Sequence, residues 1–344
     1  MNGKYNYLIA FLQVYGIILV VMGHVNMSWA IDNPLYIFRE WIYSFHMPLF
    51  VFISGYLLLY TVHKEPTNKG VNFFSLALQK AKRLLLPYIF ISSLVFLPKM
   101  LLNSYAVRPV ELSWSAWGRM LVYPWDNVIQ YFWFIPTLYL VTLLTVLALG
   151  MLKRLRVSLL YVVLGVFLLL NIFNPLKSVL FLNLSGVVNY LFYFALGIYY
   201  CFYQYKINKV LFMQSRNIIL LSFVISIFFL FCKVNNQFLQ NLIAVVFAVN
   251  GIIMSLSLGH IYIVKKCHFL HHLFGSSSAI YFYSWFPLVA SQQIIAKIYP
   301  LPWEVITIIA LIAGIYVPLL FYKFLCFVKK NFRYGKYVTI LLGQ

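Results

Sequence analysis

The sequence predicts an all-α integral membrane protein with about ten transmembrane helices and with both termini in the cytoplasm. Of its 344 residues, 63% are hydrophobic and only 9% are charged, and the mean hydropathy is +0.88. Soluble domains carry about 25% charged residues, so the composition excludes that class. Aromatic residues reach 19%, which suits rings that anchor a protein at the lipid headgroups. We expect one polytopic membrane domain over residues 1–344.

Long apolar runs define the expected membrane spans. A transmembrane helix needs about 20 mostly apolar residues. The first run is too long for a removable signal peptide and no small-residue cleavage pattern follows it, so we count it as a span. The ten expected spans cover residues 6–28, 36–62, 84–102, 131–151, 157–173, 187–203, 217–232, 239–264, 277–298 and 303–326.

The basic residues predict the orientation. With the N-terminus inside, 19 of the 26 Lys and Arg residues fall on one side of the membrane and seven on the other. This asymmetry predicts cytoplasmic termini and an even number of spans. It also explains the net charge of +20 without a nucleic-acid partner. The four cysteines are scattered and show no metal-ligand spacing, so we expect neither a metal site nor a disulfide framework.

Ionisable residues inside the expected spans are the candidate site. Burial of such a group costs about 2.5–3.5 kcal/mol on insertion scales, so each one is a functional candidate. His24 lies near the outer end of the first span, Arg39 and Glu40 lie at a comparable depth in the second, and His46 lies deeper. If these spans pack together, Glu40 can hold the His24 imidazole as a general base.

Each of these residues also has a structural interpretation. His24 can be an interfacial residue that bonds water or headgroups, and Arg39 and Glu40 can pair with each other. His46 can bond a backbone carbonyl that Pro48 leaves free. Gly55 suits close helix packing better than catalysis. Composition and depth alone therefore predict a polytopic protein with a buried polar site and name no reaction.

Several blocks of the chain resemble a known family. "LQVYGIILVVMGHV" (12–25) followed by "FHMPLFVFISGYLL" (45–58) is similar to the start of the membrane-bound acyltransferase type 3 family, whose members modify glycans. "KRLLLPYIF" (82–90), "FWFIPTLYLV" (132–141) and "GSSSAIYFYSWFPLV" (275–289) resemble further family blocks in the expected order. The resemblance therefore extends over nearly the whole chain.

The resemblance implies a ten-span enzyme of the cell (inner, cytoplasmic) membrane. Such an enzyme moves an acyl group, commonly acetyl, from cytoplasmic acyl-CoA to a hydroxyl of an outer glycan or lipid-linked saccharide. No cofactor is expected to stay bound, because acyl-CoA is a substrate. His24 stands at the position of the family's catalytic histidine. Gln13 replaces an arginine that many members carry, and Ser284–Trp285 stands where many have a histidine.

The chemistry assigns a role to each candidate. His24 takes the proton of the acceptor hydroxyl, Glu40 orients it, and His46 or Arg39 stabilises the negative charge of the tetrahedral intermediate. A transient acyl-imidazole is an alternative route. The expected substrate-binding residues are Gln13, Arg39, Arg83, Trp133, Tyr281, Ser284 and Trp285.

The binding assignments have competing interpretations. Arg83 belongs to "KAKR" at 80–83, where it can contact coenzyme A phosphates or serve only as a topology signal. Trp133, with Trp114, Trp117 and Trp125 of the long outer stretch 103–130, can stack on sugars or form an interfacial belt.

Two other function classes stay open. An exporter of polysaccharide or lipid-linked sugar would also have many spans and a polar interior, but it predicts internal repeats and broken half-helices, which we do not find in the sequence. An inactive sensor with an acyltransferase-like fold is the third possibility, and Gln13 favours it. Retention of His24 with its motif favours the enzyme.

Overall fold

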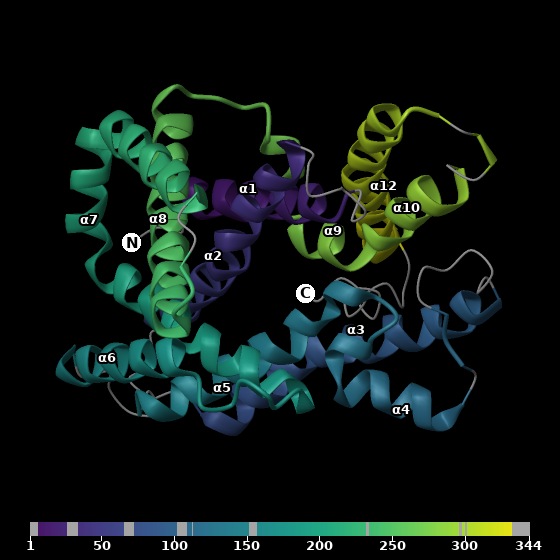
Figure 1. The fold of residues 1–344 in the computed structure, drawn as a ribbon, viewed down its shortest axis with the longest axis horizontal. Coiled ribbons are helices and arrows are strands. Elements are labelled where there is room, and N and C mark those ends of the chain that lie inside the picture. Colours follow the sequence, from purple (N-terminus) through teal and green to yellow (C-terminus); the bar gives the residue numbers. More distant parts are fainter. Residues whose placement is uncertain are drawn as a thin grey trace.

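The computed structural model describes residues 6–25, 34–64, 72–101, 109–111, 113–150, 157–231, 234–295, 298–299 and 301–331. All regular structure within these ranges is helical (Figure 1). The predicted all-α class is therefore confirmed for this part of the chain.

The helices follow the apolar runs, with short helices between them. Their bounds are α1 Tyr7–His24, α2 Pro34–Lys64, α3 Phe73–Leu101, α4 Trp114–Val122, η2 Pro124–Asp126, η3 Gln130–Trp133, α5 Phe134–Ala148, α6 Val157–Phe173, η4 Phe181–Asn183, α7 Leu184–Phe231, α8 Gln237–Val264, η5 His271–Leu273, α9 Ser277–Tyr283, α10 Trp285–Val289, the π-helix η6 Ala290–Ile295 and α12 Trp303–Asn331.

Seven of the described helices are long and apolar enough to cross a membrane. They are α1, α2, α3, the segment from η3 through α5, the segment from η4 into α7, α8 and α12. The apolar helix α6 is shorter, and its apolar part covers Ser158–Phe173. The protein is therefore a multi-pass membrane protein.

Helix α7 contains two of the expected spans. It has 48 residues, about 72 Å at 1.5 Å per residue, more than twice the ~30 Å hydrocarbon core. Its backbone leaves helical geometry at Gln214, with φ −120° and ψ 17°. Lys206, Lys209 and Arg216 around this break are exposed. The sequence predicted a connection here because of these charges, and the structure makes it helical except at the break.

Two other boundaries differ from the expected ones. Helix α3 begins at Phe73 rather than near residue 84, because the Asn72 side chain accepts hydrogen bonds from the backbone N–H groups of Phe74 (3.0 Å) and Ser75 (3.3 Å) and so caps the helix. Within the expected span 277–298, residues 277–295 form α9, α10 and η6, with Ser284 at the first junction, and residues 296 and 297 lie outside the described ranges.

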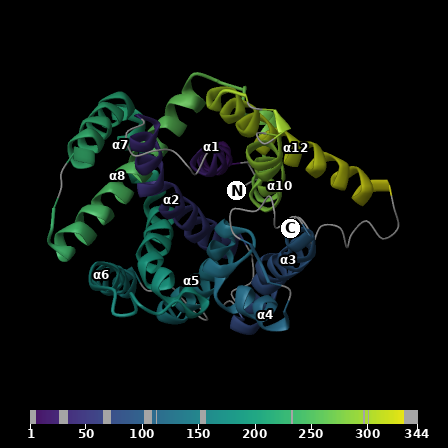
Figure 2. The same cartoon turned by 45° about the vertical axis from the view of Figure 1, so that its right-hand side comes forward.

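Helix α1 occupies the middle of the molecule. It contacts α2, α8, α9 and α12. In both cartoon views α7 and α8 lie on one side of it, α10 and α12 lie on the other, and α3 to α6 lie below (Figures 1 and 2). This position places the end of α1 where several helices can supply side chains to one site.

The crossing of α2 and α7 depends on two glycines. A Cβ at Gly55 would overlap the backbone carbonyl of Phe194, and a Cβ at Gly197 would overlap the carbonyl of Phe52. The predicted packing role of Gly55 is therefore confirmed. The close approach fixes the position of α2, which carries His46.

Candidate active site

His24 is the last residue of α1 and lies between two tyrosine rings. Its ring centroid is 4.8 Å from that of Tyr131 and 6.2 Å from that of Tyr43. The imidazole is half-buried and makes no hydrogen bond to any residue in the described ranges. Its ring nitrogens are therefore available to a substrate.

Tyr43 joins the two candidate histidines. Its hydroxyl donates to the backbone carbonyl of Gly23 at 2.7 Å, which ties α2 to the end of α1. Gly23 permits this approach because a Cβ there would lie 2.8 Å from Tyr43 Cε1. The Tyr43 ring also lies beside His46, with 5.2 Å between centroids. The structure thus brings His24 and His46 to one tyrosine.

His46 is buried and bonds the backbone. Its Nδ1 lies 2.8 Å from the carbonyl oxygen of Ile42, so in the neutral ring Nδ1 carries the proton and Nε2 is an acceptor. This contact agrees with the structural interpretation of His46 except for the carbonyl that is used. Because Pro48 has no N–H, the carbonyl left without its helical partner is that of Ser44. His46 instead bonds the carbonyl of Ile42. His46 Nε2 makes no hydrogen bond within the described ranges.

Arg39 and Glu40 form an ion pair with 3.3 Å between Nη2 and Oε1. The Arg39 guanidinium also lies over the rings of Tyr36, at 5.0 Å, and Tyr43, at 5.6 Å. In the described part of the chain, Glu40 makes no hydrogen bond to His24. The carboxylate therefore reaches the site through Arg39 rather than by direct contact with the imidazole.

The third side of the site comes from η3 and the α9–α10 junction. The Tyr131 hydroxyl lies 3.2 Å from Ser284 Oγ, and the Tyr281 hydroxyl donates to the backbone carbonyl of Tyr131. Ser284 is almost fully buried. These bonds hold the Tyr131 ring against His24, so Ser284 and Tyr281, both predicted site residues, belong to its support.

The remaining predicted residues lie farther from His24. Gln13 is eleven residues earlier on α1, so it lies on nearly the same helix face about 16 Å away along the axis. Arg83 is exposed on α3, which packs against α4 and α5. The ring of Trp133 lies between those of Trp125 and Tyr190.

Trp285 packs edge-on against Phe286, with 5.5 Å between ring centroids. Its neighbour Ser284 bonds Tyr131. Trp285 is therefore adjacent in sequence to Ser284, which supports Tyr131, and its own ring packs on Phe286.

Two residues at the site, and one buried polar residue elsewhere in the chain, were missed from the sequence. Tyr43 and Tyr131 flank His24, and only the fold shows this, because they come from α2 and η3. Gln292 lies in η6, where its buried Nε2 has no hydrogen-bond partner among the described residues. In the sequence, the pair of glutamines within an otherwise apolar run could have marked Gln292 as a buried polar residue. The π-helix of η6 is a second indication, because π-helical turns often occur at functional sites.

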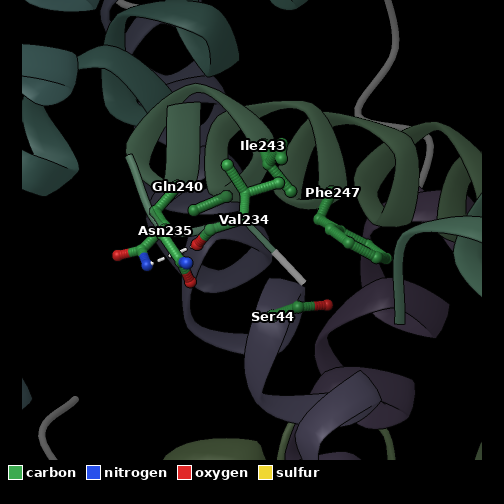
Figure 3. A pocket seen from close by; sticks show the side chains of 7 residues that line it. Ser44, Val234, Asn235, Gln240, Ile243 and Phe247 are labelled. Carbon is green, nitrogen blue, oxygen red and sulfur yellow. Dashed lines mark hydrogen bonds between the residues drawn. The ribbon is translucent and has the colours of Figure 1, made fainter. Parts of the chain in front are cut away.

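An open pocket of about 530 Å³ lies between α2 and the start of α8 (Figure 3). In it Ser44 of α2 faces the side chains of Gln240, Ile243 and Phe247 on α8. The Gln240 amide donates to the carbonyl of Val234 at 2.7 Å. The lining includes none of the predicted site residues, so this pocket is separate from the group around His24.

The family of the chain follows from its comparison with known proteins. No curated protein and no solved structure matches it. A family model described as an acyltransferase domain matches residues 6–323. This range includes His24, both flanking tyrosines and the α9–α10 junction, and it extends over most of the 344 residues. The chain therefore belongs to the acyltransferase type 3 family.

Proposed function

We propose that the protein transfers an acyl group, commonly acetyl, from cytoplasmic acyl-CoA to a hydroxyl of an extracytoplasmic glycan or lipid-linked saccharide, with His24 as general base. Family membership supports membrane acyltransferase activity. The O-acyl product, the donor and the acceptor are the parts that we propose.

The observation that carries the assignment is the environment of His24. The imidazole is half-buried, is packed between Tyr43 and Tyr131 and has no hydrogen-bond partner among the described residues. A histidine that only supports the fold uses its ring nitrogens on protein groups. His46 uses one nitrogen, Nδ1, on the Ile42 carbonyl, whereas His24 uses neither on a described residue. A base must keep a nitrogen free for the proton that it removes.

The reaction can be written with these residues. His24 removes the proton of the acceptor hydroxyl as its oxygen attacks the thioester carbonyl. A C–O bond forms, the C–S bond breaks, and the proton passes from His24 to the departing thiolate of coenzyme A. The products are an ester and free coenzyme A.

Neighbouring groups support this step in different ways. In the proposal His46, when protonated, donates from Nε2 to the developing oxyanion, while its Nδ1 stays on Ile42. Arg39 supplies positive charge at the rim, and Glu40 holds it in place. Tyr131 is a positioning residue, because its hydroxyl bond to Ser284 keeps its ring against the imidazole.

The donor enters, in this proposal, from the cytoplasmic side. The chain crosses the membrane ten times with both termini inside: α7 supplies two spans on either side of Gln214, α6 supplies one, and α9 through η6 supply one. Arg83 contacts the coenzyme A phosphates, and Gln13 lies on the face of α1 that leads from the inner side to His24. The membrane is the inner (cytoplasmic) cell membrane.

The test uses inside-out membrane vesicles supplied with radiolabelled acetyl-CoA. Label should appear in the glycan fraction with wild type and should be lost with His24→Ala. His272→Ala is the matched control, because His272 is an exposed histidine stacked on Tyr316 and should leave transfer unchanged.

Equal labelling by wild type and His24→Ala would remove His24 as the base. If neither protein labels any acceptor, while deletion of the protein changes glycan export, the transferase assignment is wrong.

A further inference from the structure

An aromatic stack extends inward from the surface formed by η2 and η3. The Trp125 and Trp133 rings are nearly parallel, 13° apart with 4.8 Å between centroids, and Trp133 in turn stacks on Tyr190 at 5.8 Å and 24°. Trp133 is therefore covered on both faces. Trp125, which is 38% exposed, is the accessible end of the stack.

Trp125 is held by its indole nitrogen. Nε1 donates to Asn183 Oδ1 at 2.9 Å, and Asn183 Nδ2 donates to Thr137 Oγ1 at 2.8 Å. Asn183 is 2% exposed and has a left-handed backbone with φ 52°, as does Leu182 with φ 47°. Such conformations cost free energy and persist where the surroundings impose them. These contacts thus fix the orientation of the Trp125 ring in the structure.

This arrangement differs from that of an interfacial anchor. An anchoring tryptophan keeps its N–H toward water or headgroups, whereas Trp125 points its N–H to a buried amide. Trp114 on α4, which is 87% exposed and touches Trp117 only edge-on, fits the anchor role instead.

A charged pair adjoins the exposed ring. Asp126 follows Trp125 in η2 and binds Arg119 with 2.7 Å between Oδ2 and Nε. The side chains are 46% and 69% exposed, so their remaining donor and acceptor positions face outward. The two charges cancel, which favours a ligand without net charge.

A pyranose ring matches both features. One of its faces presents C–H groups that pack on an aromatic ring, and its hydroxyls bond to a carboxylate and a guanidinium. The ring is offered to the ligand already fixed, so little ordering entropy is lost on binding.

We propose that Trp125, with Asp126 and Arg119, is a binding platform for one neutral sugar unit of the acceptor. This inference deepens the proposed function and rests on it. Tyr131 and Trp133 both belong to η3; Tyr131 faces His24, and Trp133 supports Trp125. In the proposal Trp125, which has no ring contact with His24 among the described residues, holds a sugar unit other than the one that is acylated. Sugar stacking is thus assigned to Trp125 instead of Trp133.

The test is saturation-transfer NMR on the purified full chain in nanodiscs, with no acyl donor present. The probes are cellotetraose, maltotetraose and chitotetraose, with tetragalacturonate as the acidic comparison. At least one neutral probe should bind with a roughly millimolar Kd. Trp125→Ala should weaken that binding at least tenfold, and Trp125→Phe should keep part of it. Trp114→Ala should bind like wild type, and tetragalacturonate should bind more weakly.

Three results would overturn the platform: no neutral probe binds wild type, folded Trp125→Ala and Trp125→Phe both bind like wild type, or Trp114→Ala loses as much as Trp125→Ala. Because no donor is present, the proposed reaction is tested separately. A protein that binds a probe through Trp125 but transfers no acyl group would overturn the reaction only, and one that transfers without binding there would overturn the platform only.

Discussion

Gly197→Ala tests the helix crossing that positions the site. An added Cβ would overlap the carbonyl oxygen of Phe52, which belongs to the backbone of α2 and cannot rotate away. Overpacking a tight contact costs about 1–3 kcal/mol, and a backbone neighbour places this case near the upper value. Replacing a helical glycine by alanine contributes about 1 kcal/mol in the opposite direction. The net loss in free energy of unfolding should be about 2 kcal/mol.

Gly165→Ala in α6 is the matched control. Apart from its chain neighbours and the backbone of its own helix, no heavy atom of the described residues lies within 4 Å of a Cβ at Gly165, so only the helix-propensity gain of about 1 kcal/mol applies. The two substitutions should therefore change stability in opposite directions and differ by about 3 kcal/mol.

The assay is SDS-driven unfolding of the purified protein in mixed micelles, followed by near-ultraviolet circular dichroism. Wild type should unfold between the two variants. A Gly197→Ala protein that is as stable as wild type, or more stable, would refute the α2–α7 crossing, since an uncrowded helical glycine gains stability from alanine.

Three further outcomes follow from single contacts. Tyr131→Phe and Ser284→Ala each remove one hydroxyl bond, worth about 0.5–1.5 kcal/mol, so acetyl transfer should fall roughly two- to tenfold and the double variant should be no worse than either. Additive losses in the vesicle assay would contradict this coupling. His46→Asn keeps a donor for the Ile42 carbonyl but lacks the ring nitrogen Nε2. The protein should therefore stay folded and lose about 10²-fold or more in kcat. A near-normal kcat would leave His46 with a purely structural role. Asn127→Ala removes the buried amide that bonds three partners, which should lower the free energy of unfolding by about 1–3 kcal/mol, and an unchanged SDS midpoint would show that the network contributes no net stability.

The helical membrane class could be predicted because it depends on composition and on local apolar runs. A span must satisfy its backbone hydrogen bonds internally, so a long apolar run predicts a helix without any knowledge of its neighbours. The continuity of α7 through Lys206 and Lys209 could not be predicted in this way. Charged residues mark the end of an apolar run, but they are good helix formers and need not end the helix.

The sequence by itself determined that the chain is a helical membrane protein, that His24 and His46 are the ionisable groups to examine, and which family its motifs resemble. The tertiary structure decided what surrounds those histidines. It placed Tyr43 between them, put Tyr131 of η3 against His24, and covered Trp133 while leaving Trp125 accessible. These relations join residues from separate helices, and they depend on close packing at positions such as Gly23, Gly55 and Gly197. Local periodicity shows which residues lie within one helix, whereas packing decides which side chains of different helices meet.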